Sequence, residues 1–201
     1  MPPTPRSDSK TRLLDAALTV IRRQGYAGTT VEDVCREAGL TKGSFFHHFK
    51  SKHDLGLAAA RHFSEMATSI FASAPYHAHE DPLDRLLGYV DFRIAIMQGR
   101  ELCEYTCLLG MFVQELYDTH PDIRAACAKH MHDHIAELTR DARLAIEKYK
   151  PDAPFTAESV GYFMQVVLQG SLIFAKAKQS QQVAVEALQH LRRYLELLFR
   201  C

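Results

Sequence analysis

The chain has 201 residues, 47% of them hydrophobic, and a formal net charge of zero. This length and composition provide a sizeable buried core, as one large domain or two small ones. No apolar run approaches the roughly 18 residues of a membrane span, and residues 1–10 lack the apolar core of a signal peptide. We therefore expect a soluble, cytoplasmic protein without a membrane partner.

The five cysteines are odd in number and form no CxxC pair. This pattern argues against a disulfide framework and against a zinc ribbon. We expect reduced thiols, no structural metal and no cofactor.

A helix is predicted at residues 9–23, where Leu14, Leu18 and Ile21 share one face. Gly25 follows the last turn and is expected to end this helix. The apolar face would pack behind the next segment and brace it.

The segment at residues 29–55 contains three predicted helix starts. Thr30 and Ser51 each precede an aspartate by three residues, the pattern of a capping box, and Thr41 can cap a short helix between them. Gly39 can adopt the left-handed conformation that ends one helix and lets the next begin at a steep angle. This spacing predicts a helix-turn-helix.

Charge is distributed unevenly along the neutral chain. Residues 1–56 contain nine Lys and Arg against six Asp and Glu, a net charge of +3, and the remainder has fifteen against eighteen, a net charge of −3. The positive charge coincides with the helix-turn-helix, as expected of a unit that binds nucleic acid. Because three charges provide few phosphate contacts, tight binding is expected to need a second copy.

The rest of the chain is predicted to be helical, without a strand signal. The expected fold class is all-α with about nine helices, in an N-terminal helix-turn-helix domain at residues 1–56 and a helical bundle at residues 57–201. Apolar periodicity and the breaks between segments place the later helices near residues 52–72, 82–98, 103–117, 121–149, 156–178 and 182–199.

One family shares this pattern. The order Thr-Thr, Ala-Gly-Leu, Lys-Gly-Ser-Phe-Phe-His-His-Phe and Lys-Ser-Lys-His-Asp-Leu in residues 29–55 resembles the DNA-binding signature of the TetR family of bacterial transcriptional regulators. The likeness covers residues 9–59 and is one of architecture beyond them. It implies a homodimeric repressor, not an enzyme, that a small-molecule effector releases from double-stranded operator DNA. The bundle would then bind the ligand and form the dimer.

Direct reading of DNA needs a short helix with small or polar residues at its exposed start. The helix that follows Thr41 has this character, and the resemblance places base or phosphate contacts on it, including the position of His48. Helix starts that present free N–H groups to phosphate add further candidates. The predicted DNA contacts are Thr29, Thr30, Thr41, Lys42, Gly43, Ser44, His47, His48 and Lys52.

Two of these interpretations have simpler alternatives. Thr30 could serve only as a helix cap. The rings of Phe45, Phe46 and Phe49 are expected in the core rather than on bases, because recognition of a duplex does not use base stacking by such residues.

Ligand-pocket candidates are polar groups amid aromatic residues on the central helices, although core packing is the alternative for most of them. Arg93 and Gln169 are the more informative. An arginine in an apolar helix needs a carboxylate such as Glu115 or an acidic ligand. The predicted ligand contacts are Met66, Tyr89, Arg93, Met97, Tyr105, Cys107, Met111, Glu115, Phe163 and Gln169.

The last two predicted helices have wide apolar faces with small residues between large ones. A two-fold interface of four helices, two from each copy, explains this pattern, and completion of the protomer's own core is the alternative. The predicted dimer contacts are Val160, Met164, Val167, Ser171, Leu188, Leu191 and Leu195.

Cys107 supports a narrower hypothesis. The run at residues 107–110 is similar to a branch of the family that includes electrophile- and N-ethylmaleimide-responsive repressors. A nearby cation such as Lys176 would lower the pKa of the thiol and make it reactive. The alternative is a buried, inert thiol.

Other functions stay open. His130 and His134 lie four residues apart on one helix face and could bind a metal, but a third ligand is missing and a solvated or hydrogen-bonded position is the alternative. A transcriptional activator would use the same DNA contacts. A helical metal- or thiol-dependent enzyme is a further possibility, without a paired base or a phosphate loop to support it.

Overall fold

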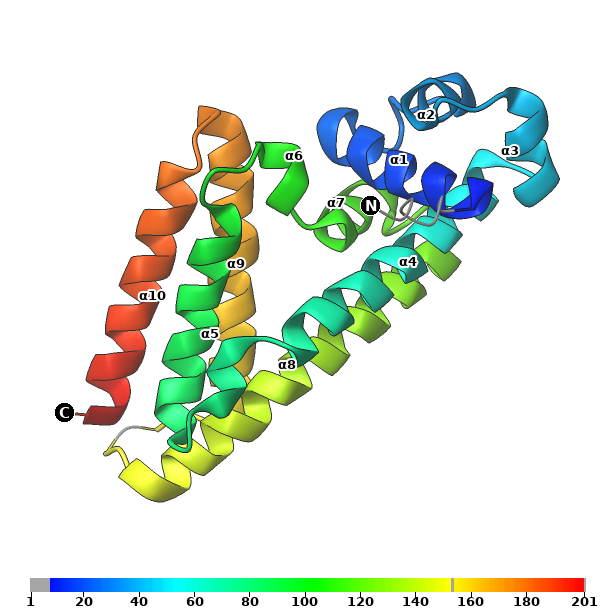
Figure 1. Cartoon of the computed structure of the whole chain (residues 1–201). Coiled ribbons are helices and arrows are strands. Elements are labelled where there is room, and N and C mark those ends of the chain that lie inside the picture. Colours follow the sequence, from blue (N-terminus) through cyan, green and yellow to red (C-terminus); the bar gives the residue numbers. More distant parts are fainter. Residues whose placement is uncertain (1–7, 153, 201) are drawn as a thin grey trace, which may run out of the picture. The chain divides into compact units, whose positions relative to one another are not determined.

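The structure is a computed structural model that describes residues 8–152 and 154–200 (Figure 1). Within these residues the chain forms ten α-helices, one 3-10 helix and no strand, which confirms the expected all-α fold class. In chain order the elements are α1 (Ser9–Gln24), α2 (Val31–Ala38), α3 (Lys42–His48), α4 (Lys52–Ala72), η1 (Pro75–Ala78), α5 (Pro82–Met97), α6 (Leu102–Tyr105), α7 (Leu108–Leu116), α8 (Pro121–Tyr149), α9 (Ala157–Lys178) and α10 (Gln182–Arg200).

The segment predicted as one helix at residues 103–117 is two helices, α6 and α7. Thr106 and Cys107 between them have extended backbones, with ψ angles of 147° and 116°. The Cys107 sulfur accepts a hydrogen bond from the N–H of Gly110 (3.4 Å) and so caps α7. Because sulfur is a weak acceptor, the sequence offers no recognisable start signal at this position.

By packing, the chain divides into two compact units. The helix-turn-helix unit comprises the chain up to Thr68 together with Cys107–Lys129, and the bundle unit comprises Ser69–Thr106 and the chain from His130 onward. Helices α4 and α8 therefore contribute residues to both units. The predicted boundary between a helix-turn-helix domain at residues 1–56 and a bundle at residues 57–201 stays a prediction.

In the helix-turn-helix unit, α1 packs against α2 and α3 (Figure 1). Leu13, Ala17 and Phe45 are fully buried in this core. Gly39 ends α2 in the left-handed region, with φ 62° and ψ 39°, and the guanidinium of Arg12 on α1 donates a hydrogen bond to the carbonyl of Ala38 (2.7 Å). The turn between α2 and α3 is thus fixed by its own backbone and by a brace from α1.

Helix α7 and the start of α8 complete this unit. The ring of Phe112 on α7 meets the ring of Tyr26 edge-on, with centroids 5.7 Å apart. The Glu115 carboxylate accepts a hydrogen bond from the N–H of Ala27 (3.0 Å). Glu115, predicted as a ligand contact or as a partner for Arg93, therefore holds the loop between α1 and α2.

In the bundle unit, α10 packs against both α9 and α5 (Figure 1). Leu86, Val90, Met164 and Leu195 are fully buried. The buried carboxylate of Asp141 on α8 pairs with Arg85 on α5 at 2.9 Å, which neutralises both charges.

Within residues 8–152 and 154–200, one helix, α9, is long and apolar enough to cross a membrane by length and composition alone. A core helix of a globular protein passes the same test, and α9 buries Val160, Met164 and Leu168 within the bundle. A single such helix therefore gives little support for a membrane span.

Replacement of Gly39 by alanine tests the turn. A residue with a side chain resists the left-handed conformation, so Gly39→Ala is expected to lower the free energy of unfolding by about 1–2 kcal/mol. Gly43→Ala is the matched control, because its new methyl group would meet only the Thr41 hydroxyl at 3.6 Å and alanine favours a helix. Urea unfolding followed by circular dichroism measures both variants; equal stability of the two would contradict the role of Gly39.

Candidate functional site

Helix α2 begins with a complete capping box. The Thr30 hydroxyl accepts a hydrogen bond from the N–H of Asp33 (3.1 Å), and the Asp33 carboxylate accepts one from the N–H of Thr30 (3.0 Å). Hydrogen bonds from Thr30, and from Arg36 after them, lower the pKa of Asp33 to about 2. Thr29 is only 1% exposed and donates its hydroxyl proton to the carbonyl of Gly25, so it fixes the loop before α2. Thr30 is exposed, and its role in DNA contact stays a prediction.

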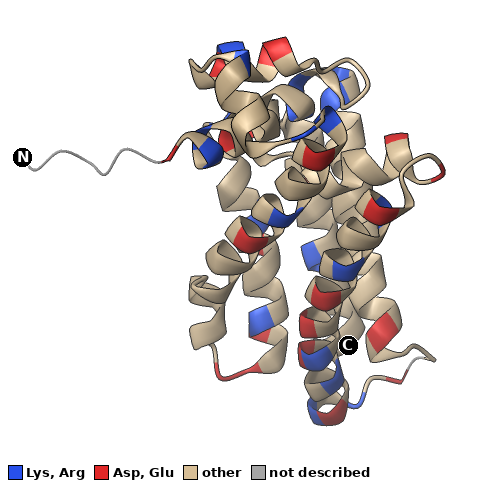
Figure 2. Ribbon diagram, turned by 90° about the vertical axis from the view of Figure 1, so that its right-hand side faces the viewer, with Lys and Arg blue, Asp and Glu red and all other residues tan. Residues whose placement is uncertain are grey.

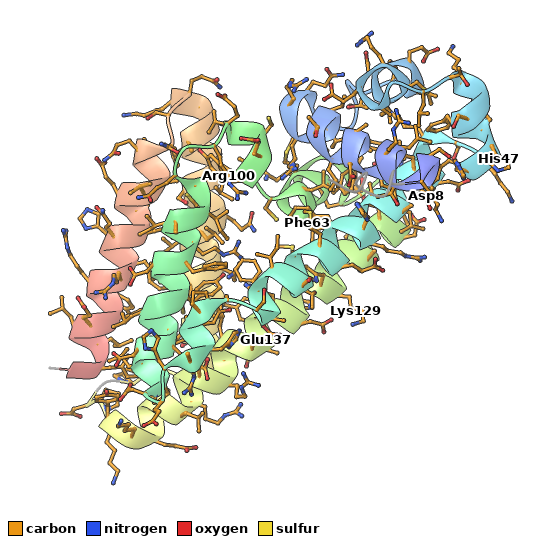
Figure 3. The ribbon with its side chains drawn as sticks, in the orientation of Figure 1. Asp8, His47, Phe63, Arg100, Lys129 and Glu137 are labelled. Carbon is orange, nitrogen blue, oxygen red and sulfur yellow. The ribbon has the colours of Figure 1, made fainter. Side chains whose placement is uncertain are left out.

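Helix α3 presents the expected polar surface. The hydroxyl of Thr41 caps it by accepting from the N–H of Ser44 (3.2 Å). Thr41, Lys42 and Gly43 are exposed, and Ser44 is half-buried. His47 is exposed and points outward from the end of α3 (Figure 3). The start of α3 is therefore open to a partner, as reading a DNA groove requires.

His48 and Lys52 are engaged within the unit. The His48 Nε2 lies 2.6 Å from the Ser9 hydroxyl on α1, a hydrogen bond. The Lys52 ammonium donates to the carbonyls of Tyr26 (3.0 Å) and Thr29 (2.9 Å) and lies over the Tyr26 ring. A phosphate contact by Lys52 would have to replace these bonds, and both DNA-contact assignments stay predictions.

Phe46 is not in the core, contrary to expectation. Phe45 and Phe49 are buried, but Phe46 on the same helix is 58% exposed. Its ring meets the Phe45 ring edge-on at 5.2 Å, so one face stays open to solvent. An exposed aromatic ring on α3 offers an apolar contact for a thymine methyl group. Hydrophobicity alone did not predict this, because adjacent helix positions such as 45 and 46 point in directions about 100° apart and do not both face the core.

Basic residues of the helix-turn-helix unit alternate with acidic ones (Figure 2). Three ion pairs join them on the surface: Lys42 with Glu32, Arg36 with Asp33 and Arg23 with Glu37. Exposed pairs of this kind contribute only about 0–1 kcal/mol. The cations are thus available to phosphate at little cost.

The bundle unit contains a polar cluster in an aromatic core. The Tyr89 oxygen accepts hydrogen bonds from Arg93 Nε (2.9 Å) and Gln165 Nε2 (2.6 Å), and its proton goes to His134 Nε2 (2.9 Å). Burial of His134, together with the charge of Arg93, lowers the pKa of this imidazole to about 3. The structure therefore brings together two predicted ligand residues, Tyr89 and Arg93, with two residues that the predicted set omits.

The remaining predicted ligand residues are dispersed. Met66, Cys107, Met111 and Glu115 belong to the helix-turn-helix unit. In the bundle unit Met97 is 2% exposed, Phe163 packs on Tyr194 at 5.0 Å, and Gln169 is half-buried. The hydroxyls of Tyr105 and Thr106 are buried without a hydrogen-bond partner among the described residues. Helix periodicity does not show that Gln165 and His134 meet Tyr89, because this contact depends on the rotamers of side chains on three different helices.

The cysteines and histidines provide no metal site within the described ranges, where no three His, Cys, Asp or Glu side chains converge. The ring nitrogen Nε2 of His134 is occupied by Tyr89 and Arg93. Cys107 is half-buried as the cap of α7, and Cys127 is fully buried, which raises its pKa to about 12. The reactivity of Cys107 stays a prediction.

The exposed apolar side chains of α9 and α10 differ from the predicted dimer contacts. All predicted contacts except the half-buried Val167 are buried in the protomer's own core. A second set of large apolar side chains is 41–65% exposed on the same two helices: Tyr162, Phe163, Val166, Ile173, Phe174, Tyr194 and Leu197. We refer to this set as the α9–α10 surface.

A braced turn that presents a polar recognition helix, followed by an all-helical bundle, defines a helix-turn-helix transcriptional regulator. A family model described as "Bacterial regulatory proteins, tetR family" matches residues 13–59, and one described as "Tetracyclin repressor-like, C-terminal domain" matches residues 82–191. The chain belongs to the TetR family.

Individual relatives agree with this assignment. The transcriptional repressor DhaR of Mycobacterium sp. (strain GP1) is 30% identical over 55% of this chain, and the match spans 54% of the length of DhaR. The transcriptional regulator AcuR of Cereibacter sphaeroides is 28% identical over 82% of this chain and 74% of its own. A TetR-family regulator from Agrobacterium tumefaciens has the same fold, with a TM-score of 0.82 and 20% identity over 95% of this chain and 97% of its own.

The neutral state of His134 makes stability depend on pH. Because its folded pKa (about 3) lies below the ordinary value of 6.5, the unfolded chain takes up a proton first as the pH falls, and stability is lost from about pH 6.5 downward. The stability advantage of the wild type over His134→Gln should shrink by about 2 kcal/mol between pH 8 and pH 5.

Urea unfolding at both pH values measures this difference. His190→Gln, which removes an exposed histidine of α10, is the control and should show no such change. An advantage of the wild type over His134→Gln that is equal at the two pH values would mean that His134 takes up its proton in the folded state.

Proposed function

We propose that the protein is a cytoplasmic, dimeric transcriptional repressor that a small-molecule effector releases from its operator. The observation that supports this most directly is α3. Its start is polar and exposed at Thr41, Lys42 and Gly43, and its direction is fixed by the turn at Gly39. This is what a helix that reads the major groove requires.

Two copies of α3, one from each protomer, would enter successive major grooves of a near-palindromic operator. Their separation would be about one helical turn of DNA, roughly 34–36 Å. Lys42 and Ser44 would contact base edges or phosphates, the exposed ring of Phe46 would meet a thymine methyl group, and the start of α2 at Thr30 would face a phosphate.

The α9–α10 surface is the proposed dimer interface. Large apolar side chains such as Val166, Phe174 and Leu197 are more than half exposed in the protomer, and several such side chains on two paired helices are typical of an interaction site. Pairing of the two helices with their counterparts in a second copy would bury it around a two-fold axis. The buried residues of the same helices would support this surface from behind.

Effector control would act through α4. This helix begins at Lys52, next to α3, and its last residues belong to the bundle unit. An effector bound in the bundle would shift α4 and change the separation of the two α3 helices, and it favours the released state only as far as it binds that state more tightly. The relative DhaR is a transcriptional repressor, which favours repression over activation.

A gel-shift experiment with a fragment of the protein's own promoter tests the proposal. Sequence-selective binding is expected at nanomolar protein and physiological salt, with little binding to a fragment of scrambled sequence. Equal binding to both fragments, with and without cell-extracted small molecules, would refute the proposed function.

Lys42→Ala tests the recognition helix. Loss of one cation per protomer should weaken operator binding about tenfold and reduce the slope of log K against log salt by about 2 for the dimer. Lys129→Ala, which removes an exposed lysine of α8, should leave both quantities unchanged. A salt slope that is the same in Lys42→Ala and the wild type would show that Lys42 does not contact DNA.

Phe174→Asp tests the dimer surface. A carboxylate in an apolar interface must be desolvated, so dimer dissociation should become at least about a hundredfold easier. Tyr117→Asp is the control, since Tyr117 has a similar exposure (60% against 62%) but lies outside α9 and α10. Sedimentation velocity distinguishes monomer from dimer, and a Phe174→Asp protein that stays dimeric at low micromolar concentration would place the interface elsewhere.

A further inference from the structure

The guanidinium of Arg93 on α5 lies among aromatic rings of the bundle unit. Its central carbon is 4.1 Å from the centroid of the Phe71 ring and 5.2 Å from that of Tyr89. Phe71 is 6% exposed and Tyr89 is 2% exposed, whereas the Arg93 side chain is half-buried. One face of the cation therefore lies against aromatic rings.

None of the hydrogen-bond partners of Arg93 has a negative charge. Its Nε donates to the Tyr89 hydroxyl (2.9 Å), and its Nη2 lies 3.2 Å from Nε2 of His134. His134 is uncharged at neutral pH, because burial lowers its pKa to about 3. In the part of the chain that the structure describes, no carboxylate lies within ion-pair distance of Arg93.

Other arginines of the same unit show the contrast. Arg85 on α5 pairs with Asp141 at 2.9 Å, and Arg192 on α10 pairs with Asp91 at 2.9 Å. These two guanidinium groups, which also lie between helices, are each neutralised by an aspartate. Arg93 is held by hydrogen bonds to neutral groups, and none of its described partners compensates its charge.

The hydrogen bonds of Arg93 leave a fork of donors free. A guanidinium has five N–H groups, and the two described bonds use one on Nε and one on Nη2. The hydroxyl that orients Nε is itself fixed, because Tyr89 also accepts from Gln165 at 2.6 Å and donates to His134. The free N–H groups are therefore oriented before any ligand arrives, which is the arrangement that a planar carboxylate binds in two-point fashion.

We propose that Arg93 is the anchor for the carboxylate of the effector, and that the effector is a small monocarboxylic acid with an apolar or aromatic body. This rests on the proposed function, since it specifies the ligand of the same regulator. One uncompensated cation matches one negative charge, and the aromatic environment that Phe71 and Tyr89 form around Arg93 favours an apolar body over a polar one. Tyr89, His134 and Gln165 act as positioning residues that orient Arg93.

Binding of matched acids and amides by the full-length protein tests the proposal. Benzoate, trans-cinnamate, hexanoate and octanoate are each compared with their primary amide by isothermal titration calorimetry, because the amide keeps the shape and removes the charge. At least one acid should bind the wild type ten- to a hundredfold more tightly than its amide, as expected for a charge-assisted pair. No preference for any of the four acids would overturn the proposal.

Variants assign the preference to Arg93. Arg93→Gln should remove the preference for the acid, and Arg93→Lys should keep a reduced one, because a lysine keeps the charge but not the two-point geometry. Arg140→Gln, which removes an exposed arginine of α8 in the same unit, should behave as the wild type. An acid preference that persists in Arg93→Gln overturns the assignment. If Arg93→Gln does not fold, Arg93→Lys replaces it as the test, and an acid preference in Arg93→Lys equal to that of the wild type overturns the assignment.

The DNA experiment separates this proposal from the proposed function. If the protein binds its operator but shows no preference for an acid, the proposed carboxylate site is refuted and the proposed function stands. Acid preference that depends on Arg93, without selective DNA binding, supports the site and refutes the regulator.

Discussion

At Gly39 the backbone turns left-handed, and the N–H groups of Gly39 and Leu40 bond to the carbonyls of Arg36 and Cys35 at the end of α2. These bonds determine where α3 starts and at what angle it leaves α2. Arg12 fastens the same turn to α1 by donating to the carbonyl of Ala38. The exposure of the polar start of α3 follows from this geometry, and the proposed DNA contacts all depend on it.

The two units use their polar side chains in different ways. In the helix-turn-helix unit, Lys52 and Glu115 satisfy backbone groups of the loop between α1 and α2, so they make that loop rigid. In the bundle unit, Arg85 is neutralised by Asp141, whereas Arg93 meets only neutral partners. The proposed regulator with an anionic effector requires both features: a rigid helix-turn-helix unit and an uncompensated cation in the bundle unit.

Local signals made most of the fold predictable. Caps such as Thr30 and Thr41 and the glycine of the turn act within four residues, so the sequence alone located α2 and α3. The exposure of individual side chains and their contacts with other elements were not predictable in this way. The exposure of Phe46, the bonds of Lys52 to loop carbonyls and the burial of most predicted dimer contacts depend on which neighbouring helix lies against each face. Apolar periodicity identifies a helix face that is buried, but it does not show whether the protomer's own core or a second copy buries it.

The proposed function requires a dimer that presents two α3 helices at a fixed separation to one DNA sequence. Selection of binding sites from a random pool of duplex DNA with the purified wild-type protein tests it most directly. A dimer of this kind should enrich one inverted repeat whose half-sites are centred about 10 base pairs, or a multiple of this, apart. Enrichment of no common sequence, or of a single half-site without a partner at fixed spacing, would contradict it.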